Sequence, residues 1–226
     1  MNRAWIIDSI ADERRGLADL FESLTPVQLA SPSLCEGWSV KHVAAHVTTL
    51  FNVSMPRMAF RILGEQLSAA RAIDQLTQQM ATRPIEGIVA QLRDFADDRR
   101  HPPGRPLAPL ADLVIHGEDV RRPLGIRRTV PLDRVKAAMG FVCGGRTVGF
   151  LPSSRIRGLR FVATDADASW GQGGAVIHGP TLSLLLAVMG RRDALGDLGG
   201  AVHLLIDRLD GKRDTDEPRE RGKRRP

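Results

Sequence analysis

Three histidines lie in two segments whose apolar residues recur at helical spacing. His42 and His46 stand four residues apart in GWSVKHVAAHV, and His116 lies in ADLVIHGEDV. Asp112 precedes His116 by four residues, so a helix presents both side chains on one face. A carboxylate and an imidazole at this spacing can bind one divalent metal if a neighbouring helix supplies a third ligand. His46 is the candidate for that third ligand.

Two nitrogen ligands and one oxygen ligand suit zinc best, with other first-row metals as alternatives. Three protein ligands leave a coordination position open for water or substrate. Readings without a metal stay open here: Asp112 and His116 at this spacing also form a simple hydrogen-bonded or ion pair, and His42 is placed to pair with His46. Asp119 lies on the same side of its helix as His116, either as a hydrogen-bond acceptor for that imidazole or as a solvated acid. No residue is assigned a catalytic role.

Helical periodicity dominates the first half of the chain and supplies the elements that would carry these side chains. The spacing predicts a first amphipathic helix that reaches Phe21 and a second that begins at the capping residue Ser39 and runs toward Ile62. Further helical segments continue to residue 100, just before the breaker HPPGRP, and a last helix covers residues 107–121. We interpret these as the four main helices of a bundle.

The composition changes after this helical part. Alternating apolar residues predict a strand over residues 157–165, and the glycine-rich DASWGQGGAVIHGP predicts strand, turn and strand before a helix over residues 181–189. A linking helix is expected over residues 132–144. We therefore expect a mainly α protein with a smaller α+β part: domain 1–128 is the helical bundle, domain 129–210 is the small α+β unit, and residues 211–226 form a tail.

Bulk composition indicates a soluble globular chain rather than a disordered or membrane protein. Its 226 residues are 42% hydrophobic and 26% charged. The longest apolar run, LSLLLAVM, is shorter than the roughly 20 residues of a spanning helix. The first residues contain no continuous apolar stretch, so no signal peptide is expected. Cys35 and Cys143 form no CxxC pair, which favours two free thiols in a reducing cytoplasm.

The basic tail accounts for half of the net charge of +6, because it holds seven Lys or Arg and four Asp or Glu. It has no apolar residue to bury, so we expect disorder. Its charges alternate in sign, which does not favour RNA or anionic lipid as a partner. A nucleic-acid-associated protein that uses this tail is nevertheless kept as an alternative function.

Three blocks in order resemble the mycothiol-dependent maleylpyruvate isomerase family. CEGWSVKHVAAHV resembles that family's Cys/Pro-x-Gly-Trp-Thr/Ser-Val-x-Asp-Val-x-x-His-Leu signature, and ADLVIHGEDVRRPLG resembles its Glu-x-x-x-His-Gly-x-Asp segment. GGAVIHGPTLSLLLAVMGRRDAL is similar to its small C-terminal domain. The resemblance covers nearly the whole chain except the tail. It implies a DinB-like metal-binding four-helix bundle followed by a small α+β domain.

Carried over by position, the resemblance implies metal ligands at His46, Asp112 and His116. The family usually has glutamate at the position of Asp112 and aspartate at that of His42. The implied function is a metal-dependent, mycothiol-dependent isomerase or thiol transferase that acts on a small organic acid or electrophile. Its partners would be that substrate and a low-molecular-weight thiol. A non-catalytic metal-binding or regulatory protein of the same fold is the alternative.

Overall fold

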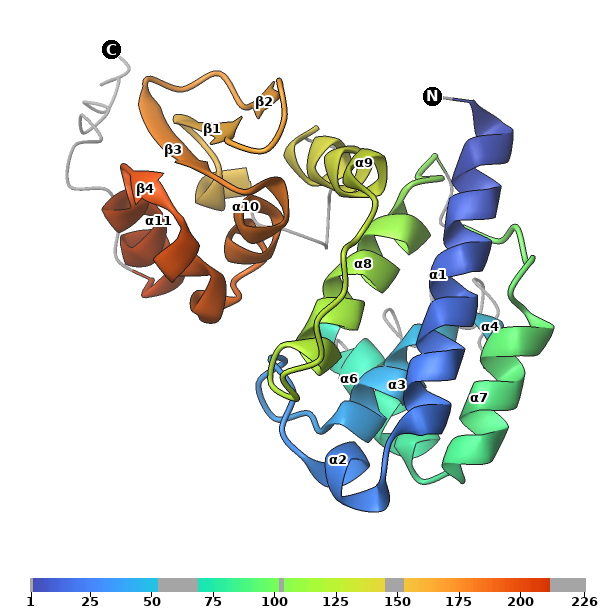
Figure 1. Cartoon of the computed structure of the whole chain (residues 1–226). Coiled ribbons are helices and arrows are strands. Elements are labelled where there is room, and N and C mark those ends of the chain that lie inside the picture. Colours follow the sequence, from blue (N-terminus) through green and yellow to red (C-terminus); the bar gives the residue numbers. More distant parts are fainter. Residues whose placement is uncertain (1, 53–68, 102–103, 145–152, 212–226) are drawn as a thin grey trace, which may run out of the picture. The chain divides into compact units, whose positions relative to one another are not determined.

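The chain divides into two compact units, Met1–Leu151 and Pro152–Pro226 (Figure 1). The structure is a computed structural model that describes residues 2–52, 69–101, 104–144 and 153–211. The predicted domain boundary after residue 128 lies N-terminal to this division, which follows Leu151. That boundary stays a prediction about which parts of the chain fold independently. The tail predicted to be disordered lies, from residue 212 onward, outside the described residues.

Helices make up the regular structure described in the first unit. α1 packs against α7 and α8, α3 packs against α6 and α8, and α9 packs against α8. The helices are α1 (Arg3–Ser23), α2 (Pro26–Ala30), α3 (Val40–Val47), α4 (Thr49–Asn52), α6 (Ala69–Ala81), α7 (Ile85–Asp94), α8 (Ala108–Arg121) and α9 (Leu132–Cys143).

Ser39 caps α3, as predicted. Its hydroxyl accepts a hydrogen bond from the backbone of His42, and the His42 ring accepts one from the backbone of Ser39, which completes a capping box. α3 ends at Val47, because Thr48 turns its backbone N–H toward Ala45 and His46. The short α4 follows directly. The expected continuation toward Ile62 lies outside the described residues.

α7 ends at Asp94, six residues before the predicted end at Arg100. The reason is a buried guanidinium from α1. Arg14 is 2% exposed and donates hydrogen bonds to the carbonyl oxygens of Phe95, Ala96 and Asp98 at 3.0, 3.0 and 2.6 Å. These bonds satisfy carbonyls that an extended helix would otherwise use, so the chain can leave the helix without burying unpaired acceptors.

The core of the first unit lies around α8. Leu110 and Ile115 of α8 and Leu17 and Phe21 of α1 are at most 1% exposed. Each such side chain contributes about 1.5–3 kcal/mol through burial. All fourteen residues of α8 are buried except Asp112 and His116, which are partly exposed. On this helix, the two partly exposed residues are thus the two that the sequence indicates as metal ligands.

The second unit is a mixed four-stranded sheet with helices. Parallel pairing joins β1 (Leu159–Ala163) to β3 (Ala175–Gly179), and antiparallel pairing adds β2 (Ser169–Trp170) and β4 (Gly199–Gly200) at the edges, in the order β2-β1-β3-β4. α10 (Thr181–Val188) packs on β1 and β3. The remaining elements are the 3-10 helices η1 (Ser153–Arg155) and η2 (Arg192–Asp197) and the helix α11 (Val202–Leu209). The predicted fold class, a mainly helical part followed by a small α+β part, is confirmed.

The two strands of DASWGQGGAVIHGP do not pair with each other, because β1 lies between them. The chain between β2 and β3 passes close to the start of β1. A Cβ on Gly173 would lie 1.8 Å from the carbonyl oxygen of Gly158, so only glycine fits there. Glycine at this position lets the chain pass from β2 across β1 to β3, whereas the sequence indicates a simple turn between the two strands. None of the helices in the described ranges is both long and apolar enough to cross a membrane.

Candidate metal centre

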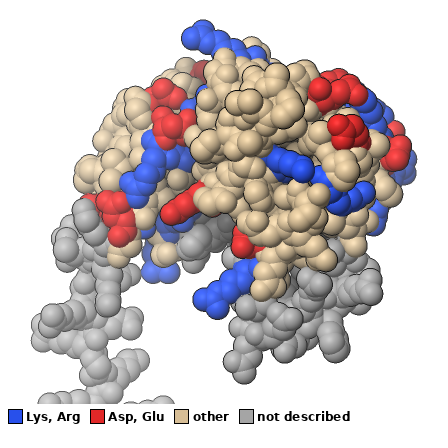
Figure 2. Space-filling model, turned by 90° about the horizontal axis from the view of Figure 1, so that it is seen from below, with Lys and Arg blue, Asp and Glu red and all other residues tan. Residues whose placement is uncertain are grey.

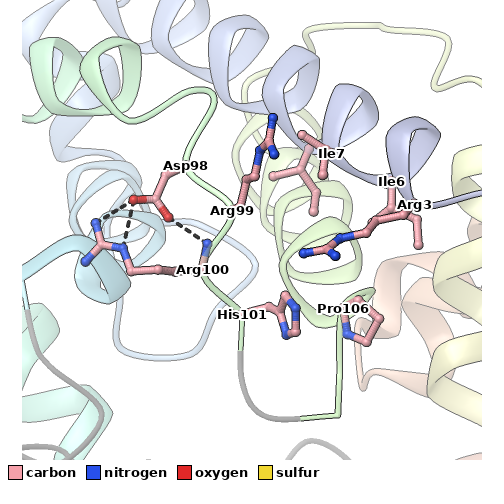
Figure 3. Close-up of a pocket in the computed structure, with 9 residues that line it drawn as sticks. Arg3, Ile6, Ile7, Asp98, Arg99, Arg100, His101 and Pro106 are labelled. Carbon is pink, nitrogen blue, oxygen red and sulfur yellow. Dashed lines mark hydrogen bonds and ion pairs between the residues drawn. The ribbon is translucent and has the colours of Figure 1, made fainter.

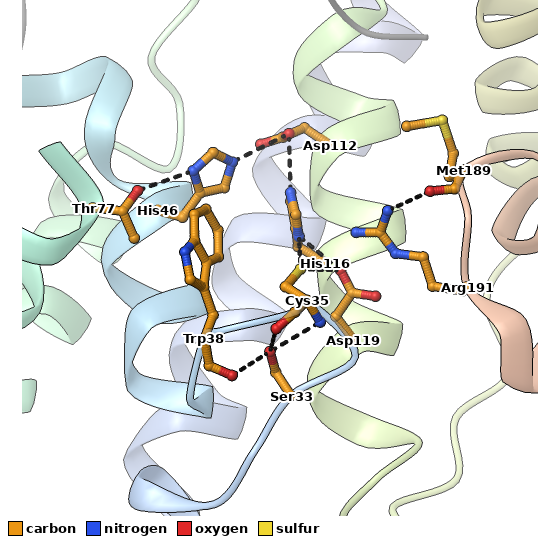
Figure 4. A network of polar contacts seen from close by, with 10 residues as sticks. All are labelled: Ser33, Cys35, Trp38, His46, Thr77, Asp112, His116, Asp119, Met189 and Arg191. Carbon is orange, nitrogen blue, oxygen red and sulfur yellow. Dashed lines mark hydrogen bonds and ion pairs between the residues drawn. The ribbon is translucent and has the colours of Figure 1, made fainter. Parts of the chain in front are cut away.

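His46 from α3 and Asp112 and His116 from α8 point toward one another (Figure 4). Their ligand atoms all lie within 4.8 Å of one another. Asp112 Oδ1 is 3.6 Å from His46 Nε2 and 3.4 Å from His116 Nε2. Ligands bound 2.0–2.1 Å from a tetrahedral zinc ion lie roughly 3.3 Å apart. The carboxylate oxygen is therefore spaced from each imidazole nitrogen as two corners of such a tetrahedron are.

The second nitrogen of each imidazole faces a protein partner. His46 Nδ1 lies 3.4 Å from the hydroxyl of Thr77 on α6, and His116 Nδ1 lies 2.8 Å from Asp119 Oδ2. An ionised carboxylate can only accept, so His116 Nδ1 donates to Asp119. Both rings then turn Nε2 toward Asp112. Protein metal sites orient histidine ligands in this way, through a hydrogen bond from the nitrogen that does not bind the metal.

The charges of the cluster are strongly coupled. Burial opposes ionisation of both Asp112 and His116, yet their mutual attraction outweighs it: the pKa of His116 lies well above its ordinary value, and the pKa of Asp112 lies well below its own. Without a metal, a proton on His116 thus compensates the charge of the Asp112 carboxylate. A divalent cation could take over that compensation, since metal ligands bind in their deprotonated forms.

Trp38 forms a wall of the cluster. Its ring centroid lies 5.0 Å from that of His46 and 6.4 Å from that of His116. Its indole N–H donates to Asp74 on α6 at 2.8 Å, which holds the ring in place. Trp38 therefore packs on both imidazoles of the cluster.

A second group of candidate ligands among the described residues shares His116 and adds Cys35 and Asp119. Cys35 Sγ lies 3.0 Å from Asp119 Oδ2 and 3.6 Å from His116 Nδ1. Together with the 2.8 Å bond between His116 and Asp119, these separations are those of hydrogen bonds. The first group is therefore the better candidate metal site. In the second group, Cys35 and Asp119 contact Nδ1 of His116, whereas Asp112 faces Nε2.

The site residues predicted from the sequence are all brought together. His46, Asp112 and His116 form the cluster, and Asp119 contacts His116 as expected. His42 stays outside it, because its ring bonds to Ser39 and to Gln78 Oε1, the latter at 2.9 Å. The open alternative that His42 pairs with His46 is wrong.

Sequence reasoning missed Thr77 and Cys35. Thr77 comes from a different helix at no fixed spacing from His46, so no local pattern could indicate it. Cys35 could have been found from its position, because it lies three residues before Trp38 at the start of the block CEGWSVKHVAAHV. It was assigned only as a free thiol.

The pocket that α1 forms with residues 98–101 and Pro106 does not offer a comparable site (Figure 3). Its volume is about 30 Å³, enough for little more than a water molecule. Asp98, which lines it, is paired with Arg100 at 2.7 Å. This pocket therefore offers no second set of metal ligands.

Comparison with solved structures gives two matches that share the fold. One is a crystal structure of the mycothiol-dependent maleylpyruvate isomerase, with a TM-score of 0.62, 14% identity, and coverage of 89% of this chain and 93% of that chain. The other is a mutant of that isomerase in which a histidine is replaced by alanine, with a TM-score of 0.60, 15% identity and the same coverage. A search of curated proteins finds no match.

The family described as "Mycothiol maleylpyruvate isomerase N-terminal domain" matches residues 10–121, a stretch that runs from α1 to the last residue of α8. This stretch contains His46, Asp112, His116 and their hydrogen-bond partners. The family match thus covers the helical part that carries the cluster, and the structural matches cover both units. By its helical part, this chain belongs to the mycothiol maleylpyruvate isomerase N-terminal domain family.

Proposed function

We propose that the protein is a metal-dependent, thiol-dependent enzyme that isomerises a small unsaturated organic acid or transfers a thiol to a small electrophile. The observation that carries this proposal is the spacing of Asp112 Oδ1 from the two Nε2 atoms, 3.6 and 3.4 Å. Three ligands with a remaining open position are typical of a catalytic metal site rather than a structural one.

Zinc is the metal we expect, because two imidazoles and a carboxylate form one of its preferred ligand sets. His46 and His116 would hold it through Nε2, and Asp112 through Oδ1. Bound zinc would lower the pKa of a coordinated thiol or water and so supply a nucleophile at neutral pH. Thr77 and Asp119 hold the two rings in the required orientation, and Trp38 keeps water from one side.

This arrangement and the fold support the reaction that we propose. The solved structures with this fold are of a mycothiol-dependent maleylpyruvate isomerase. We therefore expect mycothiol or a related thiol as cosubstrate and maleylpyruvate or a similar acid as substrate. Thiolate addition to the activated double bond gives a carbon–carbon single bond, rotation follows, and departure of the thiolate restores the double bond in the other geometry.

Metal binding is the first test. Purified protein stripped with a chelator should bind one zinc ion by titration calorimetry, and His46→Ala and His116→Ala should each lose that binding. His42→Ala is the matched control, because His42 lies on the same helix but bonds to Gln78. Equal zinc affinity in all four proteins would contradict the site.

Activity is the second test. Zinc-loaded protein should convert maleylpyruvate only when mycothiol is present, and His116→Ala should lose the conversion. Zinc binding without conversion of maleylpyruvate or transfer of mycothiol to electrophiles would favour the non-catalytic alternative of a metal-binding or regulatory protein.

The nucleic-acid alternative rests on the tail, which lies outside the described residues. On the face shown in Figure 2, Lys and Arg lie among Asp and Glu rather than in one basic patch. Neither Cys35 nor Cys143 is in a disulfide bond. We place the protein in the cytoplasm on that basis, since free thiols persist in reducing compartments.

A further inference from the structure

The loop before α3 makes two hydrogen bonds to Asp119 of α8. The backbone N–H of Leu34 donates to the carbonyl oxygen of Asp119 at 3.0 Å, and the thiol of Cys35 donates to Asp119 Oδ2, also at 3.0 Å. The loop is closed on itself by bonds from the backbone and hydroxyl of Ser33 to the carbonyl oxygen of Trp38, both 2.9 Å. The thiol that contacts Asp119 thus lies in a loop that is held in place by hydrogen bonds.

Asp119 is the point at which this loop and the histidine cluster meet. It is 0% exposed, and its Oδ2 receives both His116 Nδ1–H at 2.8 Å and the Cys35 thiol at 3.0 Å. A buried carboxylate needs donors to offset its lost hydration. Two donors on one oxygen also restrict rotation of the carboxylate, and the orientation that they select is the one that bonds His116.

We propose that Cys35 is a positioning residue of the metal centre: its thiol holds the Asp119 carboxylate, which in turn holds the His116 ring with Nε2 directed at the metal position. This inference rests on the proposed function, because it concerns the same site. Cys35 lies outside the ligand set that the family resemblance implies. It acts on the metal position through two hydrogen bonds in series, from Cys35 to Asp119 and from His116 to Asp119.

The geometry distinguishes this role from two others that a cysteine beside a metal site can have, that of a metal ligand and that of a thiolate nucleophile. Cys35 Sγ lies on the Nδ1 side of His116, 3.6 Å from that nitrogen, whereas Asp112 faces Nε2. The two ring nitrogens point to opposite sides, so the thiol does not face the metal position as a ligand. The short contact with Asp119 requires the proton to stay between sulfur and oxygen, which is the arrangement of a donor rather than of a thiolate nucleophile.

Zinc affinity of three proteins tests the role of the donor. Cys35→Ala removes it and should weaken zinc binding about tenfold, the lower end of the effect of losing a partner of a metal ligand. Cys35→Ser keeps a donor and should stay within about threefold of the unaltered protein. Cys143→Ala, which removes the other thiol, should bind as the unaltered protein does. Melting temperatures of the zinc-free proteins are measured in parallel, so that loss of fold is not read as loss of metal.

The outcomes are distinct. If Cys35→Ala binds zinc as tightly as the unaltered protein, or if Cys35→Ser weakens binding as much as Cys35→Ala, the inference is overturned while the metal site stands. If the unaltered protein binds no zinc, the proposed function fails, and the inference is then judged without a metal.

Infrared spectroscopy gives that metal-free readout. In the Cys143→Ala background the only S–H stretching band belongs to Cys35, and a thiol that donates to a carboxylate absorbs at lower wavenumber than one in water. We expect the band of the folded protein to lie below that of the unfolded protein, and Asp119→Asn to move it back. A band at the same position in the folded and unfolded protein would overturn the inference with or without zinc.

Discussion

At the scale of the residue, the short carboxylate of Asp112 is the feature that departs from the family. The family usually has glutamate there, and the side chain of aspartate is one methylene shorter. Yet Asp112 Oδ1 lies 3.4 and 3.6 Å from the two imidazole nitrogens, near the roughly 3.3 Å that a zinc tetrahedron requires. The backbone of α8 is therefore close enough for aspartate.

Asp112→Glu tests this interpretation. The additional methylene would carry the carboxylate past the position that suits both nitrogens, so zinc affinity should fall, by roughly tenfold, as when the support of a metal ligand is lost. Titration calorimetry of the two proteins measures the difference. Tighter binding by the glutamate variant would mean that Asp112 is a weakened ligand.

The two cysteines differ in their surroundings. Burial raises the pKa of the Cys143 thiol to about 12. Since the thiolate is the reactive form, alkylation of Cys143 in the folded protein at pH 8 should be roughly a thousandfold slower than that of an ordinary thiol. Mass spectrometry after iodoacetamide treatment, with and without urea, checks this. Rapid modification of Cys143 without urea would contradict it.

At the scale of the element, the end of α7 depends on one side chain of another helix. Arg14→Met would leave the carbonyls of Phe95, Ala96 and Asp98 without their buried donor. The free energy of unfolding should fall by about 2 kcal/mol or more, since the carbonyl oxygens of Ala96 and Asp98 lose their donor at about 1–3 kcal/mol each, whereas that of Phe95 keeps the N–H of Asp98. Urea denaturation measures this change.

Arg15→Met is the matched control on the same helix. Arg15 pairs with Asp97 at the surface, with half of its side chain exposed. Its loss should cost less than about 1 kcal/mol. Similar losses for both variants would mean that the carbonyls find other donors.

Elements also show how much the sequence could predict. Asp112 and His116 share a helix, so their common face follows from spacing alone, and Ser39 could be recognised as a cap from its place before an apolar run. Thr77 reaches His46 only because α6 packs against α3, which no local pattern encodes. The pairing of β1 between β2 and β3 likewise depends on a crossing at Gly173, and the end of α7 depends on Arg14.

At the scale of the whole molecule, the two units contribute differently. The residues of the candidate metal centre come from the first unit, and α9 completes that unit. The buried carboxylate of Glu13 on α1 bonds to Arg128 at 2.7 Å and to Arg134 on α9 at 2.8 Å. Helical support for the site therefore extends beyond residue 128.

A pair of truncated chains tests the predicted domain boundary. Residues 1–151 should fold and bind zinc, whereas residues 1–128 should not fold stably, because Glu13 would lose Arg134 and α8 would lose its contact with α9. Circular dichroism during heating compares the two. A cooperative, zinc-binding fragment 1–128 would establish the boundary expected from composition.

The burial of α8 has a consequence for variation. Twelve of its fourteen residues are buried, so substitutions there should lower the abundance of the protein in cells almost regardless of chemistry. Asp112 and His116 are the exceptions, because both are partly exposed, and apolar residues that replace both members of an ion pair are often tolerated or stabilising. Replacing Asp112 and His116 together should therefore lower abundance less than replacing two of the buried residues of α8, whereas it should abolish zinc binding. On this helix, the two residues that folding needs least are then the two that zinc binding needs most.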